Sequence, residues 1–180
     1  MCIRDRGIYV TESMGHISYY NCVVDQTSSS SNAISNRNLS YGSSTSTVEN
    51  CVVYGNDGAD HAIYLTEQVA HPVVKNNIIC YIGTTGIGMY ITSKTSGTSQ
   101  DVTYRDSVYN NTCYNVTSST RYGSNLLTTY PVFADTTNGY YGNGAGSPSI
   151  DSGTQGDYAH DKYGTTRPQN SVWDRGITEQ

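Results

Sequence analysis

Large apolar side chains are scarce in this 180-residue chain, in which phenylalanine and tryptophan occur once each and apolar residues make up 36% of the total. The length is typical of one domain. Such a composition cannot build a broad globular core, whereas a solenoid needs only a narrow core that successive repeats share. The shortage therefore favours a repeat architecture.

Long apolar runs and an excess of positive charge are also missing. No run of 18 apolar residues occurs, so we expect no membrane-spanning segment. Lysine and arginine number 10 against 15 aspartate and glutamate residues, and the net charge is −5. An acidic chain is poorly suited to a polyphosphate backbone, so we expect no nucleic-acid partner.

A helical period of 3.6 residues is absent as well, and strand-like alternation takes its place. Residues 48–67, VENCVVYGNDGADHAIYLTE, contain two short apolar runs that alternate with period two on either side of a polar turn. Runs of this kind, rich in β-branched residues, indicate strands with one buried face. The sequence therefore predicts an all-β chain.

The same pair of predicted strands occurs four times. The asparagine before the first strand recurs in each copy, as Asn21, Asn50, Asn76 and Asn110. In the first three copies, 12 residues separate this asparagine from the start of the next second strand, whereas the return to the next asparagine varies in length. A coil of stacked rungs with one fixed corner and one variable corner has this pattern.

Each asparagine is expected at a tight corner, because Asn tolerates the left-handed backbone conformation at low cost. Stacked rung upon rung, the corner amides are expected to bond to one another. Alternation assigns the side chains, so that Val53 points inward and Val52 outward. The other side chains expected to point inward are Ile8, Val10, Tyr19, Cys22, Val24, Val48, Cys51, Ile63, Leu65, Val74, Asn77, Ile79, Met89 and Ile91.

Five cysteines occur without any CxxC pair: Cys2, Cys22, Cys51, Cys80 and Cys113. Four of them fall about once per repeat, and free cysteine is among the most buried residue types. A column of small buried thiols is the favoured interpretation; a disulfide or a metal site is the alternative.

The repeats over residues 7–115 resemble the right-handed parallel β-helix of the pectate-lyase-like superfamily. The resemblance implies an all-β coil of about four rungs, in which the strand after the variable turn belongs to the sheet whose outer face usually carries the carbohydrate cleft. A tyrosine column, interrupted at Ser35, and a neighbouring threonine column lie on that face. The implied substrate-binding residues are Tyr9, Arg37, Tyr64, Thr66 and Tyr90.

Beyond residue 115 the period ends, and short motifs follow in order: PVFAD at 131–135, GSPSIDSG at 146–153, RPQ at 167–169 and WDRGITE at 173–179. They are similar to the C-terminal segment of secreted bacterial β-helix proteins, which commonly reads DPxF…GSPAIDAG…RPQ…DIGAYE. The last motif departs from that pattern at Arg175 and Thr178. The resemblance implies that residues 116–180 form an irregular segment capping the open end of the coil, and that the protein is secreted or attached to the cell surface.

The first six residues, MCIRDR, look like the translation of a sequencing-adaptor oligonucleotide. We therefore expect residues 1–6 to be a non-native leader and the chain to be the C-terminal part of a longer protein. The leader has no apolar h-region, and an expected truncation accounts for the missing signal peptide.

The catalytic signatures of the resembled family are missing. Its lyases pair a base with calcium-binding acids, and its hydrolases use close carboxylate pairs. The candidate catalytic residues are Glu12, Glu67, Asp60 and His61; Glu12 and Glu67 would lie about 10 Å apart, a separation compatible with inverting hydrolysis. Asp57 and Asp60 are the candidate calcium ligands, with an ordinary turn as the favoured alternative.

Two classes of function stay open. The first is a monomeric protein that binds polysaccharide or a cell-surface glycan, and whose full-length form would cleave it as a lyase or glycoside hydrolase if catalytic residues lie upstream. The second is a non-catalytic adhesin or structural surface β-helix. The tyrosine column favours sugar binding, because exposed tyrosine rings offer flat apolar area with a polar tip.

Overall fold

The computed structural model describes residues 2–4, 8–11, 17–26, 32–37, 46–55, 61–66, 72–82, 86–91, 93–95, 98–100, 108–117 and 124–180. Every regular element in these ranges is a β-strand, which confirms the predicted all-β class. No helix in this part of the chain is long and apolar enough to cross a membrane.

Three parallel sheets contain the repeats. The first sheet has the order β12 (Met89–Ile91), β8 (Ile63–Thr66), β5 (Ile34–Arg37), β2 (Ile8–Thr11). The second sheet has the order β15 (Val108–Tyr109), β9 (Val73–Lys75), β6 (Ser46–Glu49), β3 (Ile17–Tyr20). The third sheet has the order β1 (Cys2–Arg4), β4 (Val23–Gln26), β7 (Val52–Gly55), β10 (Ile78–Tyr81), β16 (Thr112–Tyr114).

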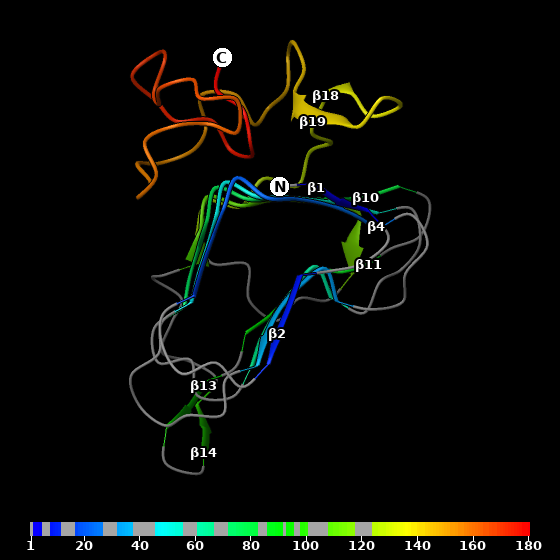
Figure 1. Cartoon of the computed structure of the whole chain (residues 1–180), viewed down its shortest axis with the longest axis vertical. Helices are drawn as coiled ribbons and strands as arrows, with labels where there is room; N and C mark the ends of the chain where they lie inside the picture. The colour runs from blue at the N-terminus through cyan, green and yellow to red at the C-terminus, as the bar shows by residue number, and fades with distance from the viewer. Residues whose placement is uncertain are drawn as a thin grey trace.

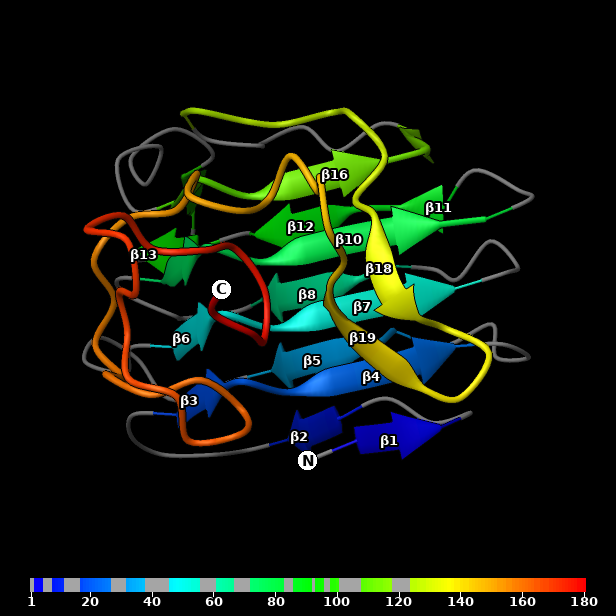
Figure 2. The ribbon, with the colours of Figure 1, turned by 90° about the horizontal axis from the view of Figure 1, so that it is seen from above.

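The chain passes from one sheet to the next, and each strand pairs with its equivalent one repeat away. Figure 1 shows the three sheets around a common interior, and Figure 2 shows the equivalent strands stacked above one another. We call one passage through the three sheets a rung. The predicted stacking of parallel strands is confirmed, and the arrangement is compatible with a parallel β-helix.

Two small sheets accompany the stack. Strand β11 (Gly86–Ile87) pairs in parallel with β17 (Val116–Thr117), and β13 (Ser93–Thr95) pairs antiparallel with β14 (Thr98–Gln100). Both pairs lie outside the repeated three-strand pattern.

The interior follows the predicted alternation. Val24, Val53 and Ile79 of the third sheet and Ile63 and Leu65 of the first belong to one buried apolar cluster. Cys22, Cys51 and Cys113 join this cluster as free thiols, as expected for a buried column. Cys80 is also buried and free but packs on the other face of the third sheet.

The corner asparagines have the predicted backbone and a different side-chain role. Asn21, Asn50, Asn76 and Asn110 have φ angles of 52°, 54°, 57° and 53°. Their amides do not stack on one another: Asn21 donates to the His160 carbonyl, and Asn76 donates to the Thr154 carbonyl. The expected amide ladder at the corners is therefore wrong.

A ladder exists one residue further along, at the inward position. Asn77 Nδ2 donates to Asn111 Oδ1 at 3.0 Å and to the Val48 carbonyl at 2.9 Å. Cys51 N in turn donates to Asn77 Oδ1 at 2.9 Å. Asn77 and Asn111 thus form hydrogen bonds with buried backbone groups, at inward positions that apolar side chains fill in other rungs.

Residues 131–180 lie across the outer face of the third sheet (Figure 2), with a hairpin of β18 (Phe133–Asp135) and β19 (Tyr140–Asn143). Tyr141 and Ile177 from this segment pack on Val52 and Ile78 of the sheet. Val52, expected to face outward, is therefore buried, and residues 131–180 cover the side of the coil rather than its end.

Residues 124–127 extend the stack instead. Ser124 and Leu127 make parallel bridges to Tyr109 and Thr112, and Asn125 has a φ of 53°. A fifth corner asparagine therefore lies beyond residue 115, where the sequence predicts that the period ends.

Candidate functional site

An aromatic cluster lies on the outer face of the first sheet, formed by His61, Tyr64 and Tyr90. Tyr64 of β8 and Tyr90 of β12 are register partners on adjacent parallel strands. Their rings stack with centroids 5.3 Å apart and an interplanar angle of 14°. In-register strands about 4.8 Å apart bring identical side chains into this stacking distance.

His61 completes the cluster from the turn before β8. Its ring lies 5.0 Å from that of Tyr64 and 5.4 Å from that of Tyr90. Its Nδ1 is 3.1 Å from Asn32 Oδ1, which orients the imidazole against the two tyrosines. His61 is a catalytic candidate from the sequence, and the structure brings it together with two of the predicted substrate-binding residues.

The cluster is accessible from outside the sheet. Tyr90 is 39% exposed, and Tyr64 and His61 are half-buried. The stack therefore offers an aromatic surface that a ligand can reach.

The column continues below Tyr64 in the predicted order. Ser35 is the register partner of Tyr64, and Tyr9 is the register partner of Ser35. Two residues further along the same strands, Arg37 is the register partner of Thr66. The backbone thus sets Tyr9, Arg37 and Thr66 on the same sheet as the cluster; their side chains lie outside the described part of the structure.

The remaining predicted catalytic and calcium residues, namely Glu12, Asp57, Asp60 and Glu67, lie outside the described residues. Among the described side chains, no group of three or more His, Cys, Asp or Glu residues could hold a metal ion. The calcium hypothesis thus stays a sequence-based one.

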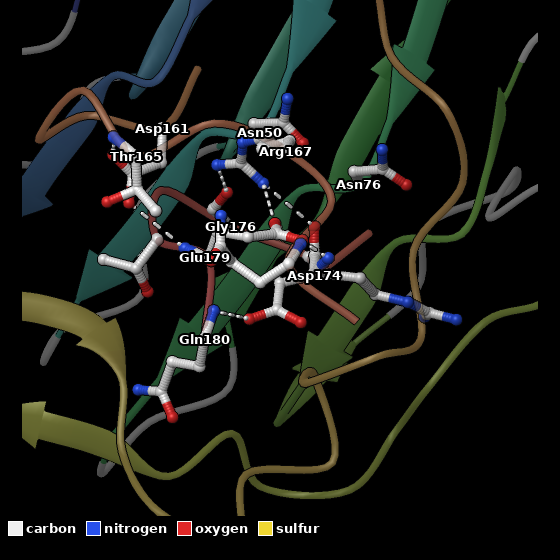
Figure 3. Close-up of polar contacts among 12 residues, drawn as sticks. Asn50, Asn76, Asp161, Thr165, Arg167, Asp174, Gly176, Glu179 and Gln180 are labelled. Carbon is white, nitrogen blue, oxygen red and sulfur yellow. Dashed lines mark hydrogen bonds and ion pairs between the residues drawn. The ribbon is translucent and has the colours of Figure 1, made fainter. Parts of the chain in front are cut away.

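The C-terminal segment contains a buried polar network (Figure 3). Arg167 forms a 3.1 Å ion pair with Glu179 and donates to the Gly176 carbonyl at 2.8 Å. Asp161 accepts from Thr165 N at 2.8 Å, and Asp174 accepts from Gln180 N at 3.0 Å. The motifs at 167–169 and 173–179 contain Arg167, Asp174 and Glu179, but they did not predict this network.

Burial shifts the pKa values of charged groups in this network. Burial lowers the pKa of Arg167 and raises the pKa of Asp174 above its ordinary value. Perturbed pKa values also mark active sites, but here the buried charges are paired inside the protein, Arg167 with Glu179 and Asp174 with backbone N–H groups. Both Asp174 oxygens accept backbone N–H groups, from Asp151 and Gln180. We therefore assign the network to structure.

A second ion pair lies where the segment meets the corners of the coil. Glu49 and Lys75 are register partners at the ends of β6 and β9, with Oε2 and Nζ 3.6 Å apart. Glu49 also accepts from Asp157 N, at 2.9 Å for Oε1 and 3.1 Å for Oε2. The fully buried Glu49 thereby acts as an anchor for the loop around Asp157.

A cavity of about 720 Å³ opens beside this loop, with Asp157, Arg167 and Trp173 in its wall. Trp173 is only 7% exposed, with the Arg167 guanidinium 5.7 Å from its ring. Its ring therefore offers little free face to a ligand. The aromatic cluster of His61, Tyr64 and Tyr90 stays the better candidate site.

No protein-family model, curated protein or solved structure matches the chain.

Proposed function

We propose that the protein is a right-handed parallel β-helix of the pectate-lyase-like type and that the outer face of its first sheet binds an extended polysaccharide. The observation that carries the proposal is the stacked, accessible pair Tyr64–Tyr90 with His61 against both rings. Sugar rings have apolar C–H faces, which pack on tyrosine rings, and hydroxyl groups, which pair with polar tips.

The spacing of the site suits an extended ligand. Side chains on adjacent strands recur at about 4.8 Å, close to the length of one sugar unit in an extended chain. Successive sugars would therefore meet the equivalent positions Tyr64 and Tyr90 on adjacent rungs. The threonine column and Arg37 would supply polar contacts and, for acidic sugars, a charge.

The cover on the third sheet supports the choice of face. Val52, Ile78 and Cys80 on that sheet are buried beneath Tyr141 and Ile177. A glycan cannot reach those side chains while the segment is in place. Tyr90 on the first sheet is 39% exposed, so no described residue covers it in this way.

The proposal includes a secreted or cell-surface location, and it concerns binding. We assign no catalytic step to the cluster. Cleavage by the full-length protein would require groups outside the described residues, and the alternative is a non-catalytic adhesin or structural surface protein.

The test is a glycan array followed by NMR titration of the glycans that bind, with the wild type and a Tyr64→Ala, Tyr90→Ala double variant. We expect wild-type affinity near about 1 mM and a loss of roughly tenfold or more in the double variant, because two aromatic contacts disappear. A matched control removes Tyr140 and Tyr163, both 56% exposed on the C-terminal segment, and should bind like wild type. Equal binding by the double variant, or equal loss in the control, contradicts the proposal.

A further inference from the structure

Cys22 and Cys51 occupy the same position on adjacent rungs. Each follows a corner asparagine and precedes a register pair of the third sheet, Val23 with Val52. Both side chains belong to the inward apolar cluster, and both are free thiols. Strands about 4.8 Å apart put the two Cα atoms within the range of about 4.4–6.8 Å that a disulfide requires.

Both thiols form hydrogen bonds to carbonyl groups of the same rung. Cys51 Sγ lies 3.5 Å from the carbonyl oxygen of Tyr19, on the rung that carries Cys22. Cys22 Sγ lies 3.4 Å from the carbonyl oxygen of Tyr20 on that same rung.

This neighbourhood is specific to the one pair. The register partners of Cys80 are Tyr54 and Tyr114, and Cys113 pairs with Ile79. Cys2 pairs with Val23 and not with Cys22. Within the described residues, only Cys22 and Cys51 are cysteines in register.

The environments of the two sulfur atoms differ. Cys22 lines a cavity of about 550 Å³ together with Tyr19, Tyr158, Asp161 and Lys162, whereas Cys51 is fully buried. The neighbouring Cys51 thiol is the main cause that lowers the pKa of Cys22 to about 7, and Lys162 adds to it. Burial raises the pKa of Cys51. Cys22 therefore borders a cavity and has the lower pKa of the two thiols, whereas burial favours the protonated form of Cys51.

We propose that Cys22 and Cys51 form a peroxide-reactive pair that closes into a disulfide between two rungs. The Cys22 thiolate attacks one oxygen of hydrogen peroxide, the O–O bond breaks, and hydroxide leaves; Cys22 is oxidised to a sulfenic acid and the peroxide is reduced. The Cys51 sulfur then attacks the Cys22 sulfur. The S–O bond breaks, and the departing hydroxyl takes the Cys51 proton and leaves as water.

Peptide mapping of the full chain tests the proposal. The protein is treated with stoichiometric hydrogen peroxide, its remaining thiols are alkylated under denaturing conditions, and it is digested without reductant. We expect one linked peptide pair containing Cys22 and Cys51, with Cys80 and Cys113 alkylated. We also expect Cys22 to react at least about tenfold faster than Cys80 or Cys113, whose pKa values burial raises to about 12.

Two variants separate the steps. In Cys51→Ser, the sulfenic acid on Cys22 should persist and be trapped by dimedone, with no linked peptide. In Cys80→Ser, the Cys22–Cys51 link should form as in wild type. The proposal is overturned if wild-type Cys22 stays alkylated after peroxide treatment, or if its link is to Cys2 or to a second molecule. The wild-type mapping decides between these outcomes even if a variant fails to fold.

Discussion

At the scale of single residues, a corner asparagine stabilises the fold both through its backbone conformation and through its side-chain hydrogen bonds. Asn76 has a φ of 57°, a conformation that most residues adopt only at a cost. Its amide group also donates to the Thr154 carbonyl at 2.7 Å and accepts from Thr154 N at 3.0 Å. The same residue thus turns the chain and holds the C-terminal segment.

Substitution separates these two contributions. We expect Asn76→Gly to lower the free energy of unfolding by about 1–2 kcal/mol, since glycine keeps the turn and loses both hydrogen bonds. Asn76→Ala should cost about 1 kcal/mol more, because alanine is also strained at positive φ. Urea denaturation of the two variants measures the difference. Equal stabilities would show that the backbone conformation contributes nothing.

Val52 and Val53 provide a test of burial on the two faces of β7. Val53 packs in the interior of the coil, and Val52 packs beneath Tyr141 and Ile177. Both Val52→Asp and Val53→Asp should therefore cost about 3 kcal/mol or more, because each buries a carboxylate without a partner. Alternation alone predicts that Val53→Asp is far more damaging than Val52→Asp. Thermal unfolding decides, with Val172→Asp as control because Val172 is 40% exposed and should change the Tm little.

At the scale of elements, the C-terminal segment is attached to the third sheet by apolar and polar contacts together. Ile177 packs on the outer face of that sheet, and the Tyr141 hydroxyl donates to the buried Asp25. Arg175 Nη1 donates to the Asn111 carbonyl at 2.7 Å. Together with the backbone hydrogen bond from Gly176 N to the Asn76 carbonyl, these side chains determine where the segment lies.

Asp174 should make the stability of this segment depend on pH. Burial raises the pKa of Asp174, so the folded chain binds its proton at pH values where the unfolded chain has released it. Stability then falls as pH rises from the ordinary pKa through the raised one. We expect urea midpoints of the wild type to fall across that window more steeply than those of Asp174→Asn, which cannot titrate. Parallel pH profiles would contradict this assignment, whatever the absolute stability of the variant.

At the scale of the whole molecule, the coil and the C-terminal segment form one unit. Val23, Val52 and Ile78 make an apolar stripe across three strands, and the segment keeps it from water. An exposed stripe of this kind on a sheet invites association. The segment therefore covers one side of the coil.

Removal of residues 131–180 should expose this stripe. We expect the shortened chain to bind 8-anilinonaphthalene-1-sulfonate and to elute as aggregates in size-exclusion chromatography, whereas the intact chain does neither. The Tyr64→Ala, Tyr90→Ala variant is the control, since it alters only the accessible face of the first sheet. A shortened chain that stays monomeric and dye-free would show that the segment does not protect the sheet.

Local pattern was enough to predict which side chains point inward and where the chain turns within the repeats. Alternation with period two identified the inward residues such as Ile63 and Leu65, and recurring asparagines identified the left-handed corners. The equal spacing of Tyr64 and Tyr90 within their repeats also predicted that they would be neighbours, because equivalent positions of stacked rungs adjoin.

Tertiary structure decided what depends on partners far away in sequence. The burial of Val52 depends on Tyr141 and Ile177. The side-chain amide of Asn21 donates to the His160 carbonyl and accepts from Arg167, both far from Asn21 in the sequence. No period relates these residues, because the C-terminal segment does not repeat. The physical reason is that a strand's alternation distinguishes its two faces, while the occupant of the outer face is chosen by side-chain packing and buried hydrogen bonds that only the folded chain brings together.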